Sequence, residues 1–156
     1  MKVIEQLRAL SDERFCAIYE TLAQDGFGPL DGEVAKAIKF RPHAIRKLPM
    51  AQRAKRARLL VESGGMADMC YELFGTYLMS GHKQLVIDFL DGTGVEHEEG
   101  MLKNPDTAKP DVEKLGNTVA ELDKNYDPAD VTLYLSMCSE QWPETTELAA
   151  AYESRV

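Results

Sequence analysis

Apolar residues recur at intervals of three and four along most of the chain, which is the spacing of one face of an α-helix. The clearest example is the segment 66–81, where this spacing holds for three turns. Glycines, prolines and capping residues separate the periodic segments and indicate where helices end. The pattern predicts further helices over 3–10, 11–26, 85–90, 112–122, 128–138 and the residues after Pro143.

The fold class follows from this pattern. No segment alternates apolar and polar residues in the way that a half-buried strand does. Residues 92–110 combine glycines, prolines and a run of charges, and predict one irregular loop. The sequence therefore predicts an all-α fold, a compact bundle of roughly eight short to medium helices without a sheet. A chain of 156 residues has the usual length of one domain, so we expect a single helical domain over 1–156.

Charge is distributed unevenly along this chain of formal net charge −8. Nine of the 18 basic residues lie between Lys36 and Arg58, and no Asp or Glu interrupts them. From residue 88 onward the chain carries 16 acidic residues and five basic ones. The sequence thus divides into a basic flank, 34–61, and an acidic C-terminal half, 88–156.

The basic flank is the feature that points to function. Residues 49–61 predict a helix that begins at Pro49 and docks through a narrow stripe of small apolar side chains. Its basic residues surround that stripe and repel one another, so an opposite charge nearby would stabilise the helix. We expect the segment 36–58 to bind an anionic partner. The residues predicted to bind it are Lys39, Arg41, Arg46, Lys47, Arg53, Lys55, Arg56 and Arg58.

A second pattern overlaps the first. The residue before Pro42 avoids the helical region, so the chain turns there and a second short helix starts at the proline. Apolar positions at Val34, Ile38, Phe40, Ile45 and Leu48, with Ala35 where two helices would cross, resemble the helix-turn-helix motif of DNA-binding regulators. The resemblance implies that the second helix presents His43, Arg46 and Lys47 to a groove or to phosphates. The chain departs from the motif by Lys39 at the turn and by Pro49, which shortens the second helix.

These patterns leave the class of partner open. Nucleic acid is one interpretation, and an acidic protein surface is another, including the acidic half of a second copy in a homo-oligomer. A solvated or internally paired run of charges is the third. The net charge of −8 disfavours nucleic acid at long range, although a local patch can act within a Debye length of roughly 8 Å.

An enzyme is the alternative from another class. The chain contains no phosphate-binding loop, nucleophile elbow, zinc-binding helix or dinucleotide fingerprint. A small metal-dependent or hydrolytic enzyme would have to use His97 and the carboxylates of residues 88–99. Because adjacent residues on an extended chain point in opposite directions, this segment favours a solvated acidic loop over a metal site. We favour a non-catalytic binding module and assign no catalytic residue, metal site or cofactor.

Cysteine usage and hydropathy indicate the compartment. Cys16, Cys70 and Cys138 are odd in number and far apart, which is typical of reduced thiols in a cytosolic protein. The N-terminus carries no signal-peptide pattern. The longest strongly apolar stretch, QLVIDFL, is far shorter than the roughly 20 residues of a membrane span. We expect a cytoplasmic protein without a membrane segment, and no family pattern covers the whole chain.

Overall fold

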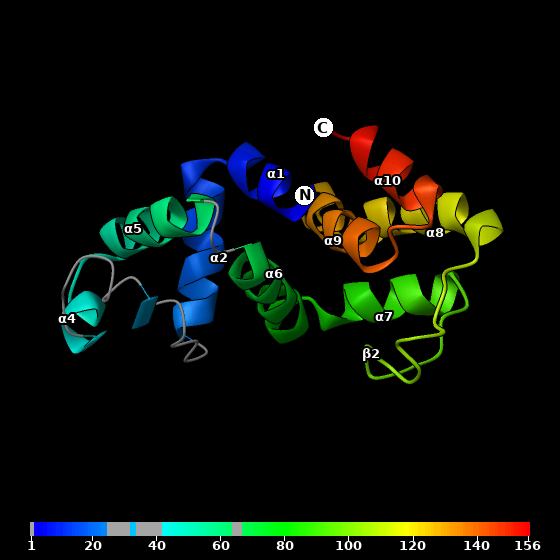
Figure 1. The fold of residues 1–156 in the computed structure, drawn as a ribbon, viewed down its shortest axis with the longest axis horizontal. Helices are drawn as coiled ribbons and strands as arrows, with labels where there is room; N and C mark the ends of the chain where they lie inside the picture. The colour runs from blue at the N-terminus through cyan, green and yellow to red at the C-terminus, as the bar shows by residue number, and fades with distance from the viewer. Residues whose placement is uncertain (1, 25–31, 34–41, 64–66) are drawn as a thin grey trace. The chain divides into compact units, whose positions relative to one another are not determined.

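The computed structural model describes residues 2–24, 32–33, 42–63 and 67–156 (Figure 1). Over these ranges it contains nine helices and one pair of short antiparallel strands, so the all-α prediction is confirmed. The chain divides into two compact units. The N-terminal unit comprises Val3–Tyr77, and the C-terminal unit comprises Leu78–Val156 with Met1–Lys2. The single domain that the chain length suggests stays a prediction.

The N-terminal unit is built around two packed helices, α2 (Asp12–Gln24) and α5 (Met50–Glu62). α2 buries its predicted apolar face, including Phe15, Ile18 and Leu22. α5 buries Ala54, Ala57 and Val61. The narrow stripe of small side chains predicted for α5 is therefore present, and it lets this helix approach its neighbour closely. The other helices of this unit are α1 (Lys2–Ala9), α4 (Pro42–Arg46) and most of α6 (Ala67–Gly81).

The segment that resembles a helix-turn-helix is described only in its second half. The residues that the motif would place in a first helix, 34–38, lie outside the described residues, as do Lys39 and Arg41. The second helix is α4, which has only five residues. Ile45 is fully buried, whereas Arg46 and the following Lys47 are exposed. Pro49 then serves as the N-cap of α5, so the helix begins at Met50, one residue after the predicted start.

The C-terminal unit places one helix at its centre. α9 (Pro128–Gln141) contacts α8 (Val112–Asn125) and α10 (Thr146–Glu153), while α7 (Lys83–Gly92) contacts α8 (Figure 1). Every residue from 130 to 139 is buried, so the burial of α9 is wider than the single apolar stripe that its sequence predicts. Its buried Ser136 and Ser139 hydroxyls donate to backbone carbonyls one turn earlier, which removes the cost of unsatisfied polar groups.

The predicted absence of a sheet needs one correction. Residues 97–102 form a hairpin in which β1 (His97–Glu98) pairs with β2 (Met101–Leu102). Glu99 and Gly100 form the two-residue turn, with φ angles of 51° and 88°. A two-residue hairpin turn of this kind requires positive φ at both positions, where glutamate is an unusual residue. The sequence therefore lacks the Asn-Gly signal that normally predicts such a hairpin.

A helix that crosses a membrane must be long and mostly apolar. Among the residues that the structure describes, no helix combines the length and the hydropathy needed to cross a bilayer.

Candidate functional site

Of the six predicted partner-binding cations that the structure describes, four are exposed to solvent. They are Arg46, Lys47, Lys55 and Arg56. In the part of the chain that the structure describes, none of their side chains makes a hydrogen bond or an ion pair. Their positive charge is therefore available at the surface of the N-terminal unit.

Arg58 is predicted to face outward, but its guanidinium forms ion pairs and hydrogen bonds within the N-terminal unit. Nε pairs with Glu62 Oε1 at 2.9 Å and Nη1 pairs with Asp12 Oδ1 at 3.0 Å. Nη2 donates to Leu10 O at 2.6 Å and, at longer distances, to two other carbonyls of the chain that ends α1. The same group lies 5.7 Å from the ring centroid of Phe15. Arg58 thus satisfies carbonyl groups that a helix end leaves without partners.

Arg53 also lies inside the unit. Only 9% of this residue is exposed, and its guanidinium carbon is 5.5 Å from the ring centroid of Tyr19 on α2. Arg53 stands four positions before Ala57, so the geometry of the helix places it beside the buried stripe. A helical-wheel projection of the sequence already places Arg53 beside the buried stripe, because residues three and four positions apart lie on the same side of a helix. Arg53 and Arg58 are therefore poor candidates for contact with a partner.

The exposed side of α5 combines positive charge with one apolar side chain. Leu59 is 61% exposed and follows Lys55 and Arg56 by four and three positions. Gln52, also exposed, stands seven positions before Leu59. Residues at these spacings lie on one helix face. We call this surface the α5 outer face, defined by Gln52, Lys55, Arg56 and Leu59. The sequence interpretation considered only its charges and missed Leu59.

A groove of about 490 Å³ separates this face from α2. On the α2 side it is lined by the acidic residues Asp12, Glu13 and Glu20, and on the α5 side by Lys55 and Arg58. The carboxylates of α2 lower the positive potential on that flank of α5. The charge of the α5 outer face is consequently least compensated on the side of Arg56 and Leu59.

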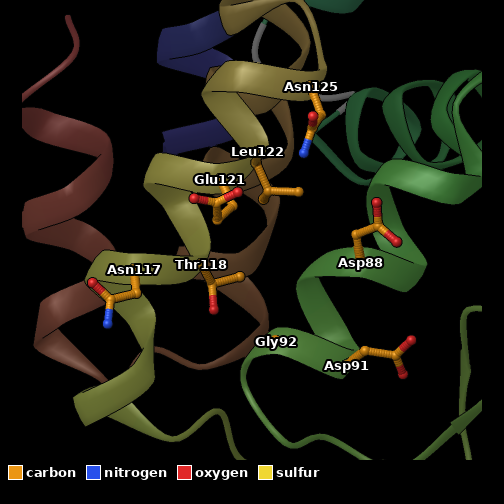
Figure 2. A pocket seen from close by; sticks show the side chains of 8 residues that line it. All are labelled: Asp88, Asp91, Gly92, Asn117, Thr118, Glu121, Leu122 and Asn125. Atoms are coloured by element: carbon orange, nitrogen blue, oxygen red, sulfur yellow. The ribbon is translucent and has the colours of Figure 1, made fainter.

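The C-terminal unit contains a pocket of opposite character. It has a volume of about 340 Å³ and lies between α7, which supplies Asp88 and Asp91, and α8 (Figure 2). We call it the carboxylate pocket. It is lined by Asp88, Asp91, Gly92, Asn117, Thr118, Glu121, Leu122 and Asn125. It therefore holds two of the carboxylates that the alternative enzyme hypothesis invokes, together with Glu121, which the sequence analysis did not single out.

The two aspartates of the pocket have mostly neutral hydrogen-bond donors. The Asp88 carboxylate accepts from the Tyr126 hydroxyl and, at 2.7 Å, from the Gln84 amide. Burial, and secondarily the hydrogen bond and the charge of Asp88, raise the pKa of Tyr126 to about 12. Glu121 has a cationic neighbour, since Lys124 Nζ lies 2.8 Å from its Oε1. The pocket thus retains negative charge that its own hydrogen bonds do not neutralise.

His97 does not line the carboxylate pocket. Its Nδ1 accepts from the Gly100 N–H at 3.0 Å, so Nε2 carries the proton that faces Asp91 Oδ1 at 2.6 Å. The His97 side chain is 12% exposed and ties the hairpin to the end of α7. Glu99 pairs with Lys83 at 2.8 Å, which lowers the pKa of Glu99.

No metal-binding arrangement is found in the described ranges, where no three His, Cys, Asp or Glu side chains are placed to hold one ion. The enzyme hypothesis built on residues 88–99 stays a prediction. Comparison with models of protein families, with curated proteins and with solved structures gives no significant match. The function must therefore be argued from the chemistry of this chain alone.

Proposed function

We propose that this protein is a non-catalytic binding module that engages an acidic surface of a protein partner through the α5 outer face. Arg46 and Lys47, which precede α5, extend the cationic surface. The observation that carries the proposal is an exposed leucine, Leu59, flanked by Lys55 and Arg56 on the outward side of a well-packed helix. Protein interfaces commonly have an apolar centre surrounded by a polar rim.

The energies of these contacts predict a modest and salt-sensitive affinity. An exposed ion pair contributes about 0.2–1 kcal/mol, so four cations supply charge steering more than tight binding. Complete burial of Leu59 by a partner would contribute roughly 1.5 kcal/mol or more. The burial of Leu59 would therefore contribute at least as much to the free energy of binding as an ion pair made by any single cation of this surface.

Several features favour protein over nucleic acid as the partner. A leucine in the middle of the cationic face cannot bind phosphates, whereas it fits an apolar side chain on an acidic helix. α4 has five residues, which is too short to present a recognition helix along a major groove. At low ionic strength, where charges are weakly screened, the net charge of −8 opposes the approach of a polyanion. Binding to nucleic acid is the competing outcome of the test below.

We also propose that the protein works in a reducing compartment such as the cytoplasm. None of the three cysteines forms a disulfide, and two of them, Cys70 and Cys138, are buried. A fold of this kind needs no oxidising environment to reach its native state.

The test uses a labelled acidic peptide that forms an amphipathic helix, with glutamates on both sides of a leucine stripe. We expect the peptide to bind at low ionic strength, and Lys55→Glu/Arg56→Glu to weaken binding about tenfold or more, through lost attraction and new repulsion. Leu59→Ser should weaken binding without changing its salt dependence. The matched control is Lys103→Glu/Lys109→Glu, which reverses two exposed lysines of the C-terminal unit.

Two results would overturn the proposal. One is equal affinity of the α5 double variant and the lysine control for the peptide. The other is tight binding of duplex DNA or RNA that falls steeply with salt and is insensitive to Leu59→Ser, because that pattern identifies phosphate contacts.

A further inference from the structure

Two surfaces of this one chain carry opposite charges that are only partly compensated; in the carboxylate pocket, Glu121 pairs with Lys124 and Asp91 bonds to His97. On the α5 outer face, Lys55 and Arg56 make no ion pair with any described residue. In the carboxylate pocket, the hydroxyl and amide donors of Asp88 carry no charge. The net charges of the two units agree with this picture. Residues 3–77 contain 11 basic and ten acidic residues, whereas Leu78–Val156 contains six basic and 16 acidic ones.

The lining of the carboxylate pocket matches the chemistry of a guanidinium group. The pocket combines the carboxylates of Asp88, Asp91 and Glu121 with the side-chain amides of Asn117 and Asn125. An arginine presents five N–H donors in a planar fork, which bind several such oxygens at once. A volume of about 340 Å³ exceeds that of one arginine side chain and is at the lower end of the range of ligand sites.

Resting on the function proposed above, we infer that the partner of the α5 outer face is a second copy of this chain. Arg56 of one copy enters the carboxylate pocket of the next, and Lys55 lies at the rim of that pocket. Because the two surfaces differ, the contact is heterologous, and a pair joined by one such contact keeps one unused surface of each kind. Such contacts join the copies into a closed ring or an open chain, and the assembly grows with protein concentration and weakens as salt screens the charges.

Sedimentation velocity of the full chain over a wide concentration range tests this inference. We expect the average mass of the wild type to rise with concentration at low salt and to fall when salt is added. Lys55→Glu/Arg56→Glu removes the donor surface, and Asp91→Asn/Glu121→Gln removes the acceptor surface while leaving Asp88 and its bond to Tyr126 intact. Each variant alone should self-associate about tenfold more weakly than the wild type.

An equimolar mixture of the two variants is the decisive sample. Each variant retains the surface that the other lacks, so the mixture should form one-to-one heterodimers that do not grow further. This positive result also shows that both variants are folded. The control for the pocket variant is Glu144→Gln/Glu147→Gln, which removes the same charge from exposed residues outside the pocket and should associate like the wild type.

A wild type that stays monomeric at every concentration and salt would overturn the inference, and so would a mixture that does not pair. Association that neither double variant weakens would overturn it as well. The acidic-peptide titration separates this failure from failure of the proposed function. If the peptide still binds through Lys55, Arg56 and Leu59, the module has an acidic partner other than itself, and only the inference is wrong.

Discussion

At the scale of single residues, Arg56 and Arg58 are separated by only one residue on α5 but have different environments. Arg56 is exposed and makes no side-chain bond to a described residue. Arg58 is 13% exposed and joins two carboxylates, three backbone carbonyls and an aromatic ring. The direction of the side chain around the helix determines whether the charge is structural or available to a partner.

We predict that Arg58→Ala lowers the free energy of unfolding by about 2–3 kcal/mol, because it removes charge-assisted bonds and leaves carbonyls at the end of α1 unsatisfied. Arg56→Ala should change it by no more than about 0.5 kcal/mol. Urea unfolding of both variants, followed by circular dichroism, measures the difference. Equal losses for the two variants would contradict the structural role of Arg58.

Tyr126 gives a pH-dependent prediction. Its pKa is raised from 10.0 to about 12 by burial and by Asp88, so the folded protein holds the phenol proton more tightly than the unfolded chain does. The resulting stabilisation is complete below pH 10 and is lost as the pH rises from 10 to about 12. The difference in ultraviolet absorbance between the wild type and Tyr126→Phe should show tyrosinate formation only near pH 12. A midpoint near 10 would contradict this environment.

At the scale of elements, α7 and α8 approach each other closely at Gly92, beside the carboxylate pocket. A Cβ atom on Gly92 would lie 2.6 Å from Thr118 Oγ1 and 2.7 Å from its Cγ2. The Thr118 hydroxyl also donates to Lys114 O at 2.9 Å, which restricts its rotation. Glycine at position 92 therefore sets the separation of the two helices and the width of the pocket.

We predict that Gly92→Ala destabilises the protein by about 1–3 kcal/mol through overpacking. Gly116→Ala is the matched control on α8, since a Cβ there meets no atom within 4 Å. Alanine in an exposed helix interior should stabilise by about 0.5–1 kcal/mol relative to glycine. Thermal unfolding measures both variants, and we expect the melting temperature to fall for Gly92→Ala and to rise for Gly116→Ala. A rise for both variants would show that the contact between position 92 and Thr118 is unimportant.

The sequence predicted the helices well and the site only in part. Helix spacing is a local property, so it identified α2, α8 and the small stripe of α5. The side on which Arg53 and Arg58 lie depends on how α5 packs against α2, which no local pattern fixes. The hairpin was missed because Glu99 takes a positive φ that tertiary structure imposes. The carboxylate pocket was missed because it joins α7 to a distant segment, α8.

At the scale of the whole molecule, the net charge of −8 conceals two different surfaces. The acidic excess lies in the C-terminal unit, whereas the N-terminal unit has nearly equal numbers of acidic and basic residues. A cationic helix face in a nearly neutral unit retains a local positive potential that an excess of acid around it would have cancelled. This separation is the physical basis of our proposal that an acidic protein binds a second acidic surface.

The most direct test of that claim is the affinity of the acidic helical peptide for two proteins of equal net charge. These are Lys55→Glu/Arg56→Glu and Lys103→Glu/Lys109→Glu. If the α5 outer face is the binding surface, the first variant binds about tenfold or more weakly than the second. If the two bind alike, overall charge governs the interaction, and the α5 outer face is a solvated surface without a partner.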